Sequence, residues 1–288
     1  DPAPSNVAEI EIVDDPTVTA PLPSTQEKCQ NGPVLDISVT PAGGVGPIYS
    51  YQWYENTTPS NIGGTPATGP GNTTATYSPD NTTIGTLYYY CVITQIASGC
   101  EVISSTAEVK ITQGPSFVLQ PIGTHVCLGA SISPLEVTYQ DGVGIPSYQW
   151  YENTIDDTTS GTMIPGQNNP TYTPLTNTVG TMYYYCKISL PQGGCAPIVS
   201  ITSEIIVDPD PIISVHPTPL QTICVGGTVN QLDVTYQDGV GTPIYQWYEN
   251  TTSSNIGGTP AIGLGNNTSI YTPNTTSFNA GTYYYYCV

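Results

Sequence analysis

Eight cysteines are the residues of this chain whose type and spacing could most readily do chemistry. Thiols pair as disulfides, bind soft metals or act as nucleophiles. Zinc binding usually needs C-x2-C pairs or Cys/His clusters, which the sequence lacks, and His125 and His216 do not occupy matching places in it. Regular spacing therefore favours disulfides formed in an oxidising compartment. The disulfide candidates are Cys29, Cys91, Cys100, Cys127, Cys186, Cys195, Cys224 and Cys287.

Carboxylates are the second group to consider for catalysis. Glu55, Glu152 and Glu249 recur in the same six-residue motif. One identical glutamate per repeat is typical of an exposed strand residue, because an enzyme rarely triplicates half of a site. Catalysis needs a nucleophile with its base, a metal cluster or paired carboxylates, and the sequence offers no such set. We expect no catalytic residues and no enzymatic activity.

Calcium is an alternative hypothesis at one place in the chain. Asp208 and Asp210 flank a proline between two repeats, near a loop that carries Asp238. Oxygen ligands converging there could stiffen the connection. The preceding connection, residues 113–115, has no acid of its own. We therefore expect no metal or cofactor in general, with calcium at this one connection as a minority hypothesis.

Asparagines in Asn-x-Ser/Thr sequons are candidates for glycosylation. Such sequons arise by chance in a chain rich in asparagine and threonine, and they carry sugar only in a host that modifies them. The candidates are Asn56, Asn72, Asn81, Asn250, Asn266, Asn267 and Asn274.

A triplicated motif defines the elements that position these residues. Tyr-Gln-Trp-Tyr-Glu-Asn begins at Tyr51, Tyr148 and Tyr245, and its tryptophans are 97 residues apart both times. Apolar and polar residues alternate with period 2 around it, with turn residues every 8 to 15 positions, which indicates strands. The sequence predicts an all-β fold of tandem immunoglobulin-like β-sandwich domains placed end to end, about 97 residues per repeat. The expected core signature is Trp53, Trp150, Trp247, Tyr89, Tyr184 and Tyr285.

Strand B of each sandwich departs from antibody domains. Ile37, Val137 and Val234 occupy its expected inward positions, where antibody domains have a cysteine. The disulfide between strands B and F that is typical of antibody domains is therefore absent.

Charge limits the partners. The formal net charge is −19, with three lysines and no arginine. Nucleic acid and anionic lipid surfaces attract clustered Lys and Arg, so we expect neither as a partner. No run of 18 apolar residues is present, and we expect no direct membrane insertion.

The repeats divide the chain into four parts. Residues 1–14 are expected to be the last strand, G, of a preceding or neighbouring repeat, because Val7 to Ile12 match Thr106 to Ile111. Residues 15–112 and 113–209 form repeats 1 and 2, and residues 210–288 form repeat 3 without its final strand. One explanation is a window on a longer chain. The other is donor-strand exchange between subunits of a pilus, and its candidate residues are Val7, Ala8, Ile10 and Ile12.

The motifs resemble those of one known group of proteins. The Trp motif, the Gly-Gly-Thr-Pro turn at Gly63 and Gly257, and the Gly-Thr-x-Tyr-Tyr-Tyr-Cys segments are similar to Ig-like tandem repeats of large Bacteroidetes cell-surface adhesins of the SprB type. The resemblance implies type IX secretion, display as filaments on the cell surface, gliding motility, and contact with polysaccharide or a solid substratum. It covers almost the whole chain and is specific to the repeat family, not to one protein.

The resemblance also implies a disulfide pairing. Each complete repeat holds three cysteines, so one must stay unpaired or bond elsewhere. Related repeats commonly keep the first and third positions, which implies the pairs Cys29 with Cys100 and Cys127 with Cys195, and leaves the second position as a buried thiol. The alternative joins the first and second positions: Cys29 with Cys91, Cys127 with Cys186 and, in repeat 3, Cys224 with Cys287.

Two classes of function remain for the chain. The first is a structural repeat segment of an extracellular adhesin or filament that extends from the cell surface and supports attachment or gliding, with neighbouring repeats or subunits as partners. The second is a glycan-binding or protein-binding module. Residues 60–67 and 254–261 are nearly identical loops, which favours spacing over distinct recognition.

Overall fold

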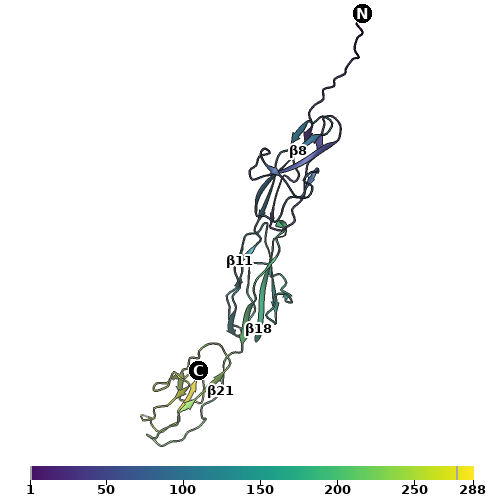
Figure 1. Cartoon of the computed structure of the whole chain (residues 1–288). Coiled ribbons are helices and arrows are strands. Elements are labelled where there is room, and N and C mark those ends of the chain that lie inside the picture. Colours follow the sequence, from purple (N-terminus) through teal and green to yellow (C-terminus); the bar gives the residue numbers. More distant parts are fainter. Residues whose placement is uncertain (1, 277) are drawn as a thin grey trace.

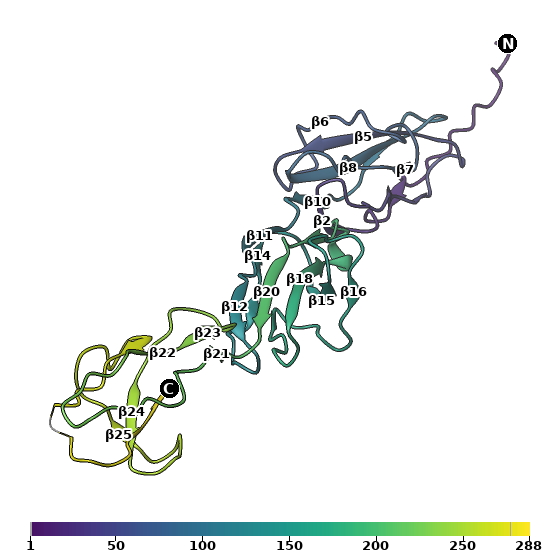
Figure 2. The ribbon, with the colours of Figure 1, turned by 90° about the horizontal axis from the view of Figure 1, so that it is seen from below.

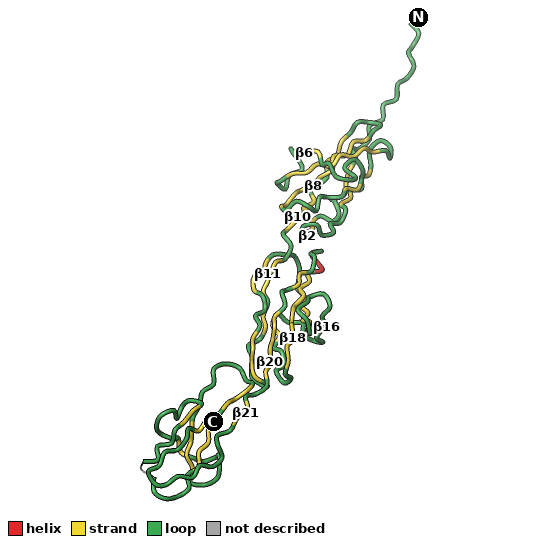
Figure 3. Tube along the Cα trace, turned by 60° about the horizontal axis from the view of Figure 1, so that its bottom comes forward, coloured by secondary structure: helices red, strands yellow, loops and turns green. Residues whose placement is uncertain are grey.

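The computed structural model describes residues 2–276 and 278–288. Figure 1 shows three β units in succession along one long axis, with residues 2–16 as an extended segment beyond the first unit. The described chain contains no α-helix, and its one short 3-10 turn, η1 (Pro191–Gly193), lies where the second unit meets the first (Figure 3). The prediction of an all-β fold with tandem immunoglobulin-like sandwiches is confirmed.

Repeat 1 is a two-layered sandwich. The larger sheet has the order β2-β10-β8-β5-β6, with β9 also paired to β8, and the facing layer consists of the pairs β1-β4 and β3-β7. Strand β10 runs parallel to β2 and antiparallel to β8, which is the pairing of strand G with strands A′ and F in immunoglobulin domains. The strands are β1 (Thr17–Val18), β2 (Thr25–Cys29), β3 (Ile37–Ser38), β4 (Pro41–Ala42), β5 (Tyr49–Asn56), β6 (Thr65–Pro66), β7 (Thr76–Tyr77), β8 (Gly85–Gln95), β9 (Glu101–Ile103) and β10 (Ala107–Thr112).

Repeat 2 repeats this topology. Its larger sheet has the order β12-β20-β18-β15-β16, with β19 paired to β18, and β12 is again parallel to β20. The facing layer consists of β11-β14 and β13-β17. The strands are β11 (Ser116–Leu119), β12 (Thr124–Cys127), β13 (Leu135–Glu136), β14 (Thr138–Gln140), β15 (Ser147–Asn153), β16 (Thr162–Met163), β17 (Thr171–Tyr172), β18 (Gly180–Ser189), β19 (Ile198–Val199) and β20 (Ser203–Asp208).

Repeat 3 has a smaller main sheet, with the order β25-β24-β27, over the pairs β21-β23 and β22-β26. Within the described residues, β27 pairs with β24 alone, so the edge that β10 and β20 occupy in the other repeats is open. The strands are β21 (Ile212–Val215), β22 (Leu232–Asp233), β23 (Thr235–Gln237), β24 (Trp247–Asn250), β25 (Thr259–Pro260), β26 (Ile270–Tyr271) and β27 (Tyr284–Cys287).

An aromatic triad forms the centre of each sandwich. In repeat 1 the rings of Trp53 and Tyr77 lie 5.8 Å apart, and those of Tyr77 and Tyr89 lie 5.2 Å apart. The indole N–H of Trp53 donates to the carbonyl of Thr74 at 2.8 Å, so the buried ring has its polar atom satisfied. The equivalent triads in the other repeats are Trp150, Tyr172 and Tyr184, and Trp247, Tyr271 and Tyr285.

The predicted inward positions of strand B are buried. Ile37, Val137 and Val234 all belong to the hydrophobic cores, so apolar side chains replace the antibody cysteine there. In strand F, Tyr90 follows the inward-facing Tyr89 and so points to the other face of the sheet, yet it is buried as well. Its ring stacks on Tyr54 at 5.3 Å and its hydroxyl accepts the N–H of Gly64, so Tyr90 is buried by its cross-strand neighbour and is not free to stack on a sugar.

Candidate functional site

The only disulfide among the described residues joins two different repeats. Cys29 of repeat 1 bonds to Cys195 of repeat 2, across 166 positions of sequence and a Cα separation of 5.0 Å. The pairs predicted within a repeat are therefore wrong. Cys29 bonds neither to Cys100 nor to Cys91, and Cys195 does not bond to Cys127. Neither Cys127 nor Cys186 is bonded, and Cys224 and Cys287 are both free as well.

The topology explains why the first and third cysteines of one repeat do not meet. Cys29 ends β2, which runs parallel to β10, so it lies at the end of repeat 1 that adjoins repeat 2. Cys100 lies between β8 and β9, at the opposite end of the same sandwich. The six residues of β10 alone separate the two ends by about 20 Å. A disulfide requires Cα atoms less than about 7 Å apart, so the third cysteine can meet only the first cysteine of the repeat before it.

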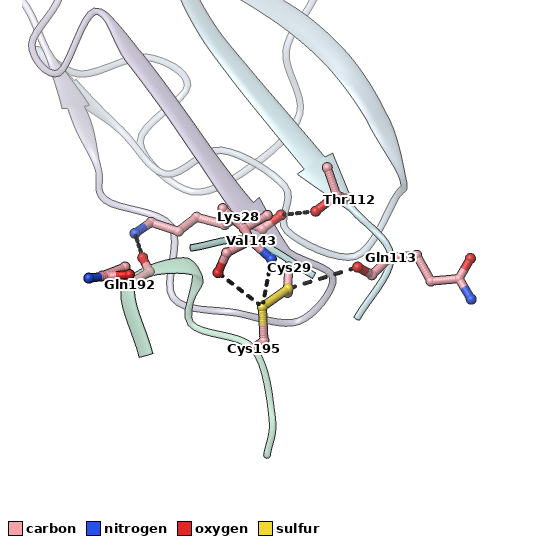
Figure 4. The surroundings of a disulfide bond; sticks show 7 residues. All are labelled: Lys28, Cys29, Thr112, Gln113, Val143, Gln192 and Cys195. Atoms are coloured by element: carbon pink, nitrogen blue, oxygen red, sulfur yellow. Dashed lines mark hydrogen bonds between the residues drawn. A yellow bond between two sulfur atoms is a disulfide. The ribbon is translucent and has the colours of Figure 1, made fainter. Parts of the chain in front are cut away.

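Three loops build this junction (Figure 4). Cys29 begins the loop after β2, Cys195 follows η1 in the loop between β18 and β19, and Val143 lies in the loop between β14 and β15. The N–H of Val143 donates to Cys195 Sγ at 3.3 Å, and Lys28 Nζ donates to the carbonyl of Gln192 at 2.9 Å. The disulfide is thus framed by polar contacts from both repeats.

The backbones approach closely beside the sulfur atoms. A methyl group on Gly32 would lie 2.8 Å from the carbonyl oxygen of Gly194, which is shorter than side chains tolerate. Gly194 itself has φ +64, a left-handed conformation that favours glycine. Two glycines therefore allow the loops of the two repeats to meet. Figure 2 shows β2 and β10 of repeat 1 adjoining β11 of repeat 2.

Burial makes the disulfide a structural bond. Cys29 is 1 % exposed and Cys195 is 7 % exposed, and both belong to the hydrophobic core of repeat 2 together with Trp150. A side chain of repeat 1 thus completes the core of its neighbour. A buried disulfide is protected from attacking thiolates, and its presence indicates an oxidising compartment.

The second-position cysteines are buried thiols. Cys91 and Cys186 lie opposite Trp53 and Trp150 in the strand register, and both are fully buried and free. Burial raises the pKa of each thiol from its usual 9.0 to about 12, since the core disfavours the thiolate. They act as small apolar side chains, as the first pairing scheme required.

The calcium candidates do not form a site. Within residues 2–276 and 278–288, no group of three acidic, histidine or cysteine side chains is arranged to hold a metal. Asp208 faces His125 instead, with 2.7 Å between Oδ2 and Nε2. The hypothesis that Asp208, Asp210 and Asp238 converge on calcium is wrong for this structure. Asp208 lies opposite Cys127 in the parallel pairing of β12 with β20, and its carboxylate reaches His125, two residues before Cys127.

Most sequon amides already have structural roles. The side-chain nitrogen of Asn72 donates to the carbonyl of Ala67 at 3.0 Å, and that of Asn81 donates to the carbonyl of Gly32 at 3.0 Å. A glycan would occupy the same nitrogen. Asn56, Asn250 and Asn266 donate to backbone carbonyls in the same way. Asn267 and Asn274 are exposed, and no described group accepts from their amide nitrogens.

The strand-exchange candidates are extended and exposed. Val7, Ile10 and Ile12 are 98 %, 84 % and 92 % exposed, and the segment that holds them and Ala8 pairs with no described strand. Ala107, Val109 and Ile111, the counterparts of Ala8, Ile10 and Ile12 in repeat 1, are buried. The apolar alternation of strand G is present here without a sheet to receive it.

A pocket of about 400 Å³ lies at the second junction. Its wall includes Cys127 and Pro211 together with Val240, Tyr245 and Val288. Cys127 and Val240 hold the positions that Cys29 and Val143 hold at the first junction. No sequence motif for a pocket was recognised there. The odd number of cysteines in each complete repeat was the available signal that a bond could cross a boundary.

Part of this chain matches a known family model, and the whole chain is similar to solved structures. A family model described as a domain of unknown function, DUF8696, matches residues 122–209, which lie within repeat 2. No curated protein matches the chain. Among solved structures, a mutated variant of three Ig domains of titin is 16 % identical, with 95 % of this chain and 96 % of that chain covered and a TM-score of 0.43.

Two further structures are similar at the same level. Extracellular domains 3–5 of Drosophila OTK are 15 % identical, with 95 % and 96 % of the two chains covered and a TM-score of 0.33. Immunoglobulin domains 1–5 of Sidekick-1 are 16 % identical, with 85 % of this chain and 50 % of that chain covered and a TM-score of 0.31. This chain has a tandem Ig-like architecture.

Proposed function

We propose that this chain is a structural repeat segment of an extracellular adhesin or filament, extending from the cell surface and supporting attachment or gliding. The observation that carries the proposal is the disulfide between Cys29 and Cys195. It joins neighbouring sandwiches covalently and so fixes the spacing between them, which a spacer needs and an isolated binding domain does not.

The composition and the arrangement support the same function. The three units follow one another along the long axis in Figure 1. The disulfide fits an extracellular location. No helix in the described part of the chain has the length and apolarity to cross a bilayer. Neighbouring repeats are the partners we propose, with polysaccharide or a solid substratum as the contact surface. An enzymatic role lacks a supporting set of residues.

Electron microscopy of native cells tests this proposal. Antibodies raised against repeat 2 and coupled to gold should decorate long thin projections on intact cells without permeabilisation. Shaving the cells with protease should remove both the projections and the attachment to polysaccharide-coated glass. Gold found only inside permeabilised cells would contradict the proposal.

Donor-strand exchange is the second candidate, favoured by one observation. The exposed Ile10 and Ile12 match the inward positions of strand G, and the edge of β27 is open in the described structure. A strand added there would satisfy the backbone of an open sheet edge. Mass spectrometry of the denatured and reduced assembly distinguishes the two candidates. A pilus dissociates under these conditions into subunits close to the 30.5 kDa of this chain, whereas a continuous adhesin does not.

A further inference from the structure

The first-position cysteines of all three repeats are presented by the same turn. The carbonyl of Cys29 accepts the N–H of Gly32 at 2.8 Å, and the carbonyl of Cys224 accepts the N–H of Gly227 at 2.9 Å. Cys127 makes the same turn with Ala130 at 3.1 Å. In repeats 1 and 2 these turns lie at the end of the sandwich that faces the following repeat, and in repeat 3 the turn lies at the equivalent end.

Repeat 3 reproduces the environment of Cys29 most closely. The side chain of Gln26 bridges the turn by bonding to both the N–H and the carbonyl of Leu35, and Gln221 bonds to the N–H and carbonyl of Asn230 in the same way. Gly227 provides the glycine that Gly32 provides at the first junction. Cys224 is exposed and free. Repeat 3 therefore presents a complete but unoccupied half of the junction.

The second junction supports this interpretation independently. The N–H of Gly239 donates to the carbonyl of Pro209 at 3.0 Å, as the N–H of Gly142 donates to Gln113 at 3.1 Å at the first junction. Cys127 lies in the wall of the pocket beside Val240. The first-position cysteine thus faces the next repeat even where no disulfide forms. The repeat itself therefore orients this cysteine towards the following repeat, and the disulfide is not needed for that orientation.

Repeat 1 presents the other half of the junction at the end opposite Cys29. Cys100 follows Cys91 by nine residues, as Cys195 follows Cys186. A glutamine ties this loop to the neighbouring one in both repeats, although at different positions. The side-chain oxygen of Gln95 accepts the N–H of Val45 at 2.6 Å, and that of Gln192 accepts the N–H of Ile145 at 2.7 Å. The N–H of Val143, the counterpart of Val45, donates to Cys195 Sγ instead.

Within the described residues, this end of repeat 1 is not covered by another repeat. Val45 is 42 % exposed, whereas Val143, its counterpart at the bonded junction, is half-buried and packs against the core that contains Cys29. Cys100 is partly exposed and free. The apolar surface around it is what the turn of a first-position cysteine covers at the first junction.

We propose that Cys100 and Cys224 are junction cysteines, and that the partner they fit is a second copy of this chain, joined head to tail by a disulfide between Cys224 of one copy and Cys100 of the next. This goes beyond the proposed function, because it concerns how repeats are linked and holds whatever surface the protein contacts. The bond makes a series of copies covalently continuous.

The chemistry requires an oxidant, for which glutathione disulfide serves. The Cys224 thiolate attacks one sulfur of glutathione disulfide, forming a mixed disulfide and releasing one glutathione thiolate. The Cys100 thiolate of the second copy then attacks the Cys224 sulfur, and the second glutathione thiolate leaves. Two cysteine thiols are oxidised, one glutathione disulfide is reduced to two thiols, and the two thiol protons pass to solvent or to the departing thiolates.

Two complementary variants test the proposal. Both carry C127S and C287A, which remove the other accessible free thiols, and one adds C100S while the other adds C224S. Each is incubated in a glutathione redox buffer alone and as an equal mixture. Non-reducing electrophoresis measures the dimers, and chymotryptic peptides analysed by mass spectrometry identify the bonds, because the chain has only three lysines for trypsin.

We expect each variant alone to stay monomeric and the mixture to form a heterodimer through Cys224 and Cys100. Random pairing of equally reactive thiols would give about two heterodimers for each homodimer of either kind; a specific junction should exceed this ratio at least about fivefold. Dithiothreitol should reverse the product. The bond between Cys29 and Cys195, mapped in the same digest, reports whether the junction is folded.

Three outcomes would overturn the inference. One is a heterodimer yield at the random ratio, and another is no dimer although the bond between Cys29 and Cys195 is intact. The third is absence of the bond between Cys29 and Cys195 in the oxidised chain, because the internal junction is the pattern from which the external one is inferred. None of these outcomes affects whether the protein is displayed on the surface of native cells. The result of this test is therefore independent of the result of the imaging test.

Discussion

Gly32 and Gly194 meet across the first junction, where a methyl group on Gly32 would lie 2.8 Å from the carbonyl oxygen of Gly194. The two residues belong to different sandwiches and are brought together by the loops that end in the disulfide. We predict that Gly32→Ala destabilises the junction by about 1 to 3 kcal/mol, the usual cost of overpacking a close contact. The measurement is the rate at which the bond between Cys29 and Cys195 reforms after reduction, which should fall.

Gly227→Ala is the matched control for this change. Its local contact is nearly the same, 3.0 Å to the carbonyl of Cys224 against 2.8 Å to that of Cys29. Gly32 faces a second repeat, whereas Gly227 does not within the described structure. Ala130 occupies the same position in the turn of repeat 2, so the turn itself tolerates alanine. Equal destabilisation by the two substitutions would mean that the turn, and not the junction, is sensitive.

The disulfide itself provides the second prediction. The double variant C29S/C195S should lose about 3 to 5 kcal/mol of stability in the part of the chain that the bond encloses, because a loop of 166 residues gains much conformational freedom when unfolded. Differential scanning calorimetry should show a lower melting temperature for repeats 1 and 2. Reduction should lower the melting temperature of the unaltered chain to the same level and leave that of the double variant unchanged. A melting temperature equal to that of the unaltered chain would contradict the prediction.

Two neighbouring tyrosines of β8 should respond in opposite directions to loss of their hydroxyls. The hydroxyl of Tyr89 is buried and has no hydrogen-bond partner among the described residues, whereas that of Tyr90 accepts the N–H of Gly64. Tyr89→Phe should be neutral or stabilising, since an unpaired buried hydroxyl costs free energy. Tyr90→Phe should destabilise by about 1 kcal/mol, because it leaves a backbone N–H unpaired. Urea denaturation of both variants measures the difference, and a large loss from Tyr89→Phe would reveal a missed partner.

Alkaline pH should weaken the fold through the buried thiols. The pKa of Cys91 and of Cys186 is raised from 9.0 to about 12 in the folded state, so unfolded chains lose these protons first. The stabilisation is fully present below pH 9 and is lost as the pH rises towards about 12. The free energy of unfolding should therefore fall between pH 9 and 10, and fall less steeply in the variant C91A/C186A. Equal slopes would show that other groups control the alkaline response.

The core was predictable from the sequence because its signals are local and repeated. Trp53 and Tyr89 recur with their neighbours three times, and period-2 alternation identified Ile37 as inward-facing without an alignment. Their burial follows from strand geometry alone. The exposure of Tyr90 was harder to judge, since it depends on the ring of Tyr54 in the next strand.

The disulfide was not predictable in the same way. Cys29 and Cys100 belong to one repeat and have suitable spacing, yet the sandwich places them at opposite ends. The partner of Cys29 follows only from the three-dimensional structure, in which the loop that holds Cys195 lies against repeat 1. Spacing along a chain does not record which end of a domain a loop occupies, and the resemblance to other repeats supplied the positions of the cysteines but not their connectivity.

The bond between Cys29 and Cys195 has a mechanical consequence. Tension applied between the two ends of the chain would enter the sulfur bridge at Cys29 and leave it at Cys195, bypassing the residues between them. The aromatic triads around Trp53 and Trp150 would then carry no load, and neither sandwich could be drawn out to its contour length. The part of the chain between Cys29 and Cys195 therefore resists extension by a covalent bond, so under flow or traction it would behave as a stiff link and not as a spring of unfolding domains.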